Sequence, residues 1–182
     1  MRILIARHGA TKEGKKGIIL GSLPGTLSTQ GKKEAKEIAK ELKTKKFIPD
    51  IIISSNQKRA LDTASIIKKE IDKNILIKID KLIAERKAGI AEGKKEEEID
   101  WSSYEKKPLL LRKHKGGESF QEVIKRAKKF SANLKKYEKY KTILIVSHSV
   151  FIAAFLSILY NQPIEKFLSS KSKNKITVFD LK

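Results

Sequence analysis

The chain contains no cysteine among its 182 residues. This absence excludes disulfide bonds, thiolate zinc sites and a cysteine nucleophile, so any covalent catalysis needs another side chain. Long hydrophobic runs are also missing: none approaches the roughly 18 uninterrupted apolar residues of a membrane-spanning helix, and the first run is too short for a signal peptide. We therefore expect a soluble, cytoplasmic protein that does not contact membranes, built as a single domain over residues 1–182.

Acidic residues are scarce, with 21 Asp and Glu against 41 Lys and Arg, which gives a formal net charge of +20. Such a charge is often found in proteins that bind nucleic acids. Here the lysines are spread over nearly every helical pattern and do not alternate with aromatic residues. This dispersion indicates solvated helix faces rather than a nucleic-acid interface, together with a positive field that attracts small anionic substrates.

Five short runs rich in β-branched residues and leucine predict buried strands. They lie at residues 2–6, 50–54, 75–79, 142–147 and 175–181. Helical patterns fall between them at residues 29–45, 57–71, 119–139 and 149–160. Asn56 is the expected N-cap of the second helix, and Ser119 with Glu122 forms a capping box that opens the third, which should end at about residue 139. This order predicts an α/β fold, a three-layer sandwich with a mostly parallel central sheet, in which ligands bind at the carboxyl ends of the strands.

Residues 86–117 show no regular period, because glycines, Pro108 and a run of glutamates interrupt it. We expect an irregular excursion over the ligand site. Its apolar residues, Trp101 and Leu109 to Leu111, either pack the segment itself, which we favour, or form a lid over a substrate.

Histidine is rare, and occurs only at positions 8, 114 and 148. Two of these residues end apolar runs: Arg7, His8 and Gly9 follow the first, and His148 follows the fourth. Because the carboxyl ends of parallel strands meet at one edge of a sheet, both histidines should converge there with Arg59, which follows the second strand.

These residue types suit phosphoryl transfer, which needs a nucleophile, positive charge around the phosphate oxygens and a proton donor. A neutral His8 can attack phosphorus, while Arg7 and Arg59 can each hold two phosphate oxygens. His148, protonated beside a bound dianion, can stabilise the transferred charge.

The spacing alone does not locate the proton donor. Glu85, Glu92 and Glu118 all lie near the expected edge of the pocket, and a carboxyl group beside a bound phosphate can donate a proton to the leaving oxygen. All three stay open as candidates, although each, taken by itself, is better explained as a solvated surface carboxylate.

Six blocks follow one another along almost the whole chain: Arg7 to Thr11, Leu27 to Gly31, Ser54 to Ala60, Glu85 with Gly89 to Gly93, Gly117 to Ser119, and Val146 to His148. In this order they resemble the histidine phosphatase superfamily, in its phosphoglycerate-mutase-like branch. The resemblance implies the family's α/β sandwich and a phosphohistidine intermediate on His8. It also implies that Arg7, Arg59 and His148 bind the phosphate and that Glu85 donates the proton, with no metal and no cofactor.

Three positions depart from the family pattern. Gly14 replaces a common asparagine and can remove a phosphate contact, Ala91 replaces an aromatic residue and widens the wall, and Ser149 replaces a glycine. Since Ser149 can add a hydroxyl near the phosphate, we count it among the phosphate-binding residues. The wall around the substrate is assigned to Gly21, Ser22 and Arg112.

The expected activity is hydrolysis of small phosphomonoesters. One alternative is a cofactor-dependent phosphoglycerate mutase, but such mutases resemble one another in a longer chain with an arginine pair that residues 86–117 lack. The other alternative is a catalytically idle protein that binds anions or nucleic acids, which would not need a proton donor. Homodimers are common in the family, although no exposed apolar stripe in this sequence requires one.

Overall fold

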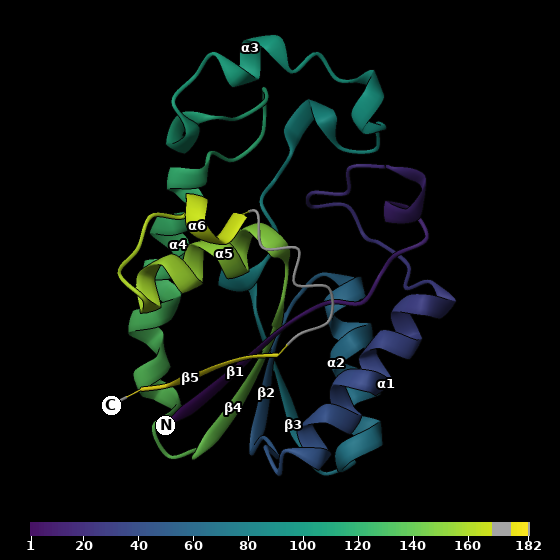
Figure 1. Ribbon diagram of the computed structural model, residues 1–182, viewed down its shortest axis with the longest axis vertical. Helices are drawn as coiled ribbons and strands as arrows, with labels where there is room; N and C mark the ends of the chain where they lie inside the picture. Colours follow the sequence, from purple (N-terminus) through teal and green to yellow (C-terminus); the bar gives the residue numbers. More distant parts are fainter. Residues whose placement is uncertain (169–175, 182) are drawn as a thin grey trace.

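The centre of the computed structural model, which describes residues 1–168 and 176–181, is a five-stranded sheet in the order β3-β2-β4-β1-β5 (Figure 1). The strands are β1 (Arg2–Arg7), β2 (Ile51–Ser55), β3 (Leu76–Asp80), β4 (Thr142–Ser147) and β5 (Thr177–Asp180). β5 pairs antiparallel with β1, and the other pairings are parallel. The prediction of a mostly parallel sheet is confirmed, while residue 175, the expected start of the last strand, lies outside the described residues.

Alternate residues of each central strand face opposite sides of the sheet and build two separate cores. In β1, Ile3 and Ile5 belong to the core beneath one helical layer, whereas Leu4 and Ala6 belong to the other. All four are at most 1% exposed. A sheet buried on both faces needs such continuous apolar strands, and this explains why the runs in the sequence do not alternate with polar residues.

Helices cover both faces of the sheet. α1 (Thr29–Thr44) and α2 (Lys58–Ile71) pack over one face, and α4 (Phe120–Asn133), α5 (Ser149–Leu159) and the short α6 (Glu165–Leu168) lie over the other (Figure 1). The capping box of Ser119 and Glu122 is present at the start of α4. The predicted three-layer α/β sandwich is therefore confirmed.

Two details of the helices differ from the expectations. The N-cap of α2 is Gln57, so the prediction of Asn56 was wrong, and the Gln57 side chain makes no capping hydrogen bond. The helix that opens at Ser119 was expected to reach about residue 139. Instead α4 ends at Asn133 and continues only as a 3-10 turn, Leu134–Tyr137.

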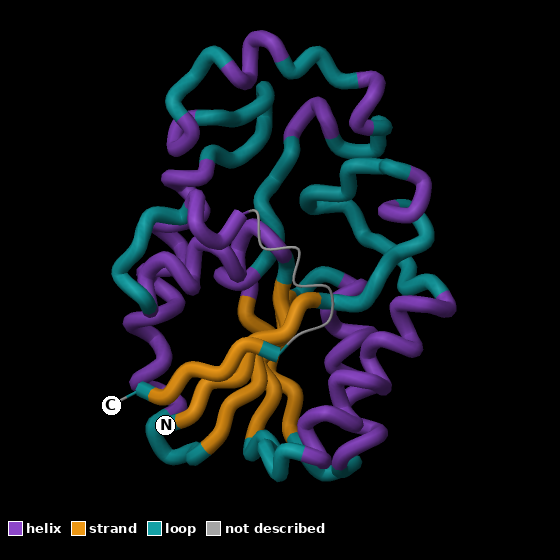
Figure 2. The backbone as a smooth tube through the Cα atoms, viewed as in Figure 1, coloured by secondary structure: helices purple, strands orange, loops and turns teal. Residues whose placement is uncertain are grey.

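Two long connections extend beyond the carboxyl ends of the strands, residues 8–28 and 81–118 (Figure 2). They contain only single turns of helix, namely Gly14–Lys16, Lys81–Ile83, Gly89–Ala91, Glu96–Glu98, α3 (Ser102–Glu105) and Leu109–Leu111. A β-bridge between Ile18 and Lys95 joins the two connections. Trp101 and Leu109 pack against one of the cores, which agrees with a packing role for this segment.

Within the described residues, no helix is long and apolar enough to cross a membrane.

Candidate active site

The two histidines at the strand ends lie side by side. In the parallel pairing of β1 with β4, Arg7 is in register with Ser147, and the backbone N–H of His8 donates to the Ser147 carbonyl at 2.9 Å. The ring centroids of His8 and His148 are 4.9 Å apart, with an interplanar angle of 56°. The convergence predicted from the sequence is therefore observed.

The hydrogen bonds of His8 assign its tautomer. Its Nδ1 lies 2.8 Å from the carbonyl oxygen of Gly9, which can only accept, so Nδ1 carries the proton. Arg59 Nε donates to His8 Nε2 at 3.2 Å, which requires a lone pair on Nε2. His8 thus presents an unprotonated Nε2 beside a guanidinium group.

The loop that carries His8 depends on a close approach of two glycines. A Cβ on Gly9 would lie 2.2 Å from the carbonyl oxygen of Gly31 in α1, so no side chain fits at this position. The N–H of Gly9 donates to Thr63 Oγ1 of α2 at 3.1 Å. Both helices of this layer therefore fix the position of His8.

Arg59, in the first turn of α2, is buried to 1% exposure. Its NH1 donates to the Leu23 carbonyl at 2.7 Å and its NH2 to the Gly21 carbonyl at 2.9 Å, so the guanidinium also holds the first long connection. Burial lowers the pKa of Arg59. A buried guanidinium, fixed by carbonyl oxygens that carry no full charge, keeps its charge available for an anion.

His148 is fully buried at the end of β4. Its Nε2 lies 2.9 Å from Ser55 Oγ of β2, and within the described structure its Nδ1 has no hydrogen-bond partner. Burial, followed by the proximity of His8 and Arg59, holds the pKa of His148 well below 6.5. For His8 the causes are burial and then Arg59, and they lower its pKa from 6.5 to about 3. Both imidazoles are therefore neutral at neutral pH.

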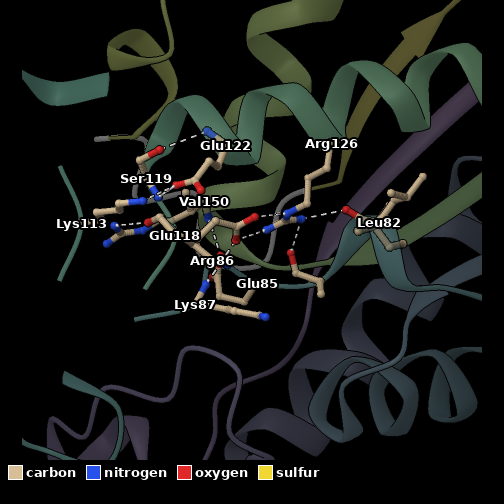
Figure 3. A network of polar contacts seen from close by, with 12 residues as sticks. Leu82, Glu85, Arg86, Lys87, Lys113, Glu118, Ser119, Glu122, Arg126 and Val150 are labelled. Atoms are coloured by element: carbon tan, nitrogen blue, oxygen red, sulfur yellow. Dashed lines mark hydrogen bonds and ion pairs between the residues drawn. The ribbon is translucent and has the colours of Figure 1, made fainter. Parts of the chain in front are cut away.

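Glu85 follows the turn after β3 and points toward the start of α5 (Figure 3). Its Oε1 accepts from the N–H of Arg86 at 2.8 Å and of Val150 at 3.2 Å, and its Oε2 accepts from Ser149 Oγ at 3.1 Å. The carboxylate is thus anchored to the residues that directly follow His148.

One cavity of about 240 Å³ brings five of the predicted residues together: Arg7, His8, Gly21, Arg59 and Glu85. Of the residues assigned to the substrate wall, Gly21 is the one that lines it, and Gly14 and Glu96 line it as well. Of the three carboxylates that spacing left open, Glu85 lines this cavity, whereas Glu92 accepts from Ser22 and Ala88, and Glu118 pairs with Arg126.

The other predicted residues have different surroundings. Ser22 Oγ hydrogen-bonds both carboxylate oxygens of Glu92, at 2.9 and 2.8 Å. The guanidinium of Arg112 donates to the carbonyls of Lys107 and Glu105, at 3.0 and 3.1 Å. Neither residue is part of the cavity wall, and the same holds for His148, which is buried behind His8, and for Ser149. The hydroxyl of Ser149 contacts Glu85.

Sequence reasoning missed Gln57. Its Nε2 donates to the Gly21 carbonyl at 2.9 Å, and its Oε1 accepts from the N–H of Glu85 at 2.8 Å, so one amide joins both long connections. The available signal was its position two residues before Arg59, on a turn that faces the cavity.

Across residues 1–168 and 176–181, no three His, Asp or Glu side chains are grouped so as to hold a metal ion.

A doubly covered, mostly parallel sheet, with two neutral histidines and buried positive charge at the carboxyl ends of its parallel strands, defines an α/β enzyme with an anion-binding active site. The family model described as histidine phosphatase superfamily (branch 1) matches residues 3–180, and the chain belongs to this superfamily. The predicted family is confirmed.

Relatives with known names support the same conclusion. Phosphoserine phosphatase 1 of Hydrogenobacter thermophilus is 32% identical over 176 residues, which cover 93% of this chain and 81% of the relative. The metal-independent phosphoserine phosphatase of Arabidopsis thaliana is 30% identical, with coverages of 99% and 77%. The chain is thus a phosphatase, a hydrolase that acts on small phosphate esters.

Solved structures share the fold. A mutant phosphoserine phosphatase from Entamoeba histolytica, in complex with phosphoserine, has a TM-score of 0.82 at 26% identity, and the match covers 100% of this chain and 91% of that one. The α-ribazole phosphatase from Shigella flexneri has a TM-score of 0.88 at 24% identity, with the same coverages.

Proposed function

We propose that this phosphatase hydrolyses small phosphomonoesters through a phosphohistidine intermediate on His8 Nε2, without a metal or other cofactor. The observation that carries the proposal is the unprotonated Nε2 of His8, held in the cavity beside Arg59 and Arg7. An imidazole that needs no deprotonation can attack phosphorus directly.

In the first step a bond forms between His8 Nε2 and phosphorus, and the ester bond from phosphorus to the leaving oxygen breaks. Glu85, which lines the same cavity, gives its proton to that oxygen, so the leaving group departs as an alcohol. Arg7 and Arg59 hold the phosphoryl oxygens throughout. In the second step water attacks phosphorus, Glu85 takes back a proton, and inorganic phosphate leaves neutral His8.

His148 has the properties of a second donor to the phosphoryl group. Its ring lies 4.9 Å from that of His8, and its buried Nδ1 lacks a partner within the described residues. A buried polar atom without a partner is costly, and an oxygen of a bound phosphate would satisfy it. The dianion would also favour the protonated form of His148, which then stabilises the transferred charge.

Hydrolysis is favoured over mutase chemistry. The phosphoglycerate mutases of Bifidobacterium longum and Nautilia profundicola match only 62% of this chain, and 46% and 49% of their own lengths.

The cavity favours a substrate that carries a positive group beside its phosphate. Glu96 lines the cavity, while its neighbours Lys95 and Glu97 pair with each other at 3.2 Å. A carboxylate there attracts an ammonium group, and the named relatives act on phosphoserine, which has one. Glu96→Gln should raise KM for phosphoserine up to about fivefold, the effect of an exposed ion pair, and leave KM for glycerol phosphate unchanged. An equal change in KM for both substrates contradicts this assignment.

The experiment that tests the proposal is phosphate release from a panel of phosphomonoesters in EDTA, including phosphoserine, p-nitrophenyl phosphate and 3-phosphoglycerate. The wild-type protein should hydrolyse members of the panel, and His8→Ala should abolish turnover and the acid-labile phosphoprotein trapped by rapid quenching. Conversion of 3-phosphoglycerate to 2-phosphoglycerate with added 2,3-bisphosphoglycerate, without phosphate release, would support a mutase instead. No activity in either assay would support the idle binder.

A further inference from the structure

Near Glu85 lies a largely buried ion pair of Arg126 and Glu118, neither of which lines the cavity (Figure 3). Arg126 Nε donates to Glu118 Oε1 at 2.8 Å, and its NH2 donates to Oε2 at 3.0 Å. The two side chains are 16% and 17% exposed. Two parallel charge-assisted hydrogen bonds of this kind fix the plane of the guanidinium.

The third nitrogen of Arg126 reaches the segment that carries Glu85. Its NH1 donates to the carbonyls of Leu82 and Ala84, both at 2.7 Å. Glu118 holds the segment on the other side of Glu85: its Oε2 accepts from the N–H of Lys87 at 3.3 Å, and its own N–H donates to the Lys87 carbonyl at 2.9 Å. The pair therefore holds the backbone on both sides of Glu85.

This segment has no regular secondary structure of its own beyond the turn Lys81–Ile83, so side chains from other elements must hold it. Ser147 Oγ donates to the Ile83 carbonyl at 2.7 Å, and Gln57 accepts from the N–H of Glu85. Arg126 is the only side chain among the described residues that donates to Leu82 and Ala84. Without it, the two carbonyls lose their side-chain donor, and the Glu118 carboxylate, which keeps the Lys87 N–H, loses its ion-pair partner in a partly buried region.

We propose that Arg126, oriented by Glu118, is a positioning residue that aims the Glu85 carboxyl group at the leaving oxygen. Arg126 is not part of the cavity wall, so it acts on the reaction through its neighbours: it holds the Glu85 segment, and its charge is the last of the causes that lower the pKa of His148. The inference rests on the proposed role of Glu85 as proton donor. It adds that a residue of α4 fixes the position of the Glu85 carboxyl group through the backbone of residues 82–84.

How kcat depends on the leaving group distinguishes a positioning role of Arg126 from a general effect on the stability of the fold. An alkoxide is a poor leaving group and needs the proton from Glu85, whereas p-nitrophenolate leaves without it. Arg126→Met keeps most of the length and the apolar stem of the side chain and removes all four of these hydrogen bonds. A small displacement of a catalytic group costs up to about 100-fold, so kcat for phosphoserine should fall about 10- to 100-fold. For p-nitrophenyl phosphate, kcat should fall less than about threefold, with KM for both substrates nearly unchanged.

Two further variants, Glu85→Gln and the double variant of Glu85→Gln with Arg126→Met, distinguish this inference from the proposed function. Glu85→Gln should produce the same selective loss on phosphoserine, and Arg126→Met should add little in its background, because both act through one proton transfer. If Glu85→Gln affects both substrates equally, the donor assignment fails and the positioning role fails with it. If Glu85→Gln is selective but Arg126→Met is not, only the positioning role is overturned.

Arg2→Met is the matched control, since Arg2 pairs with Asp180 at 2.9 Å on β1 and β5, near the opposite ends of the strands from the cavity. It should change neither kcat nor the ratio between the two substrates. Should Arg126→Met fail to fold, Glu118→Gln offers a milder test, because it retains the shape of the side chain and removes the charge. A loss of equal size on both substrates in Glu118→Gln overturns the proposal.

Discussion

The protonation state of the proposed nucleophile can be measured directly, because the chain has only three histidines. Burial, and then the charge of Arg59, hold the pKa of His8 at about 3, against 6.5 for an ordinary histidine. At pH 5 an imidazole with the ordinary pKa is only about 3% neutral, whereas His8 should be about 99% neutral. His8 should thus remain deprotonated throughout the range in which an exposed histidine becomes charged.

The assay is a proton NMR titration of the histidine ring signals from about pH 8 down to the acid limit of folding. His8→Ala and His148→Gln assign the two active-site rings. Burial also lowers the pKa values of His148 and His114, so the midpoints of these two rings should lie below 6.5 as well. A His8 midpoint close to 6.5 in the folded protein would refute the reasoning, because the unprotonated Nε2 would no longer be a property of the site.

Arg59→Met provides the second arm of the same test. Removing the guanidinium should raise the pKa of His8, but since burial is the larger cause, the pKa should stay below 6.5. A pKa unchanged by this substitution would mean that the 3.2 Å contact between Arg59 Nε and His8 Nε2 carries no electrostatic weight.

Further outcomes follow from the same geometry. Gly9→Ala places a Cβ 2.2 Å from the Gly31 carbonyl oxygen and should lower the free energy of unfolding in urea by about 2 kcal/mol or more. Ser28→Ala removes the hydroxyl that caps α1 at the Gly31 N–H; it should cost about 1 kcal/mol in that assay and leave phosphate release unchanged. Ser55→Ala removes the buried hydroxyl beside His148 Nε2 and the Gln57 N–H; it should lower kcat in phosphate release about tenfold or more and lower the free energy of unfolding by about 1–3 kcal/mol. The pKa of His8 is lower in the folded protein than in the unfolded chain, so its contribution to stability is complete above about pH 6.5 and is lost as the pH falls. In urea unfolding, the wild-type protein should therefore lose more free energy of unfolding than His8→Ala between pH 7 and pH 5.

The strands and the convergence of the histidines could be predicted because both depend on local patterns. Apolar runs of strand length mark a sheet buried on both faces, and parallel strands bring His8 and His148 to one edge without any knowledge of the loops. The register of Arg7 with Ser147 then follows from the pairing of β1 with β4. Arg59 was predictable for the same reason, since it stands just after β2.

The proton donor and its supports could not be predicted in this way. Glu85 stands on an irregular segment, and only the family resemblance, not the spacing, distinguished it from Glu92 and Glu118. Its surroundings come from hydrogen bonds between residues far apart in the chain, such as Val150 with Glu85 and Arg126 with Leu82. These bonds join side chains to backbone groups in loops and leave no period in the sequence, so Gln57 and Arg126 were missed.

The charges around His8 also couple its protonation to the occupancy of the site. Arg59 and Arg7 disfavour the imidazolium form, and the same two cations attract a phosphate dianion. A bound dianion offsets their charge, so the pKa of His8 must rise when phosphate binds. By linkage, inorganic phosphate must then bind more tightly as the pH falls through the range between the two pKa values. Product inhibition should therefore strengthen toward acidic pH after correction for the ionisation of phosphate itself, and an inhibition constant independent of pH would mean that the arginines do not act on His8.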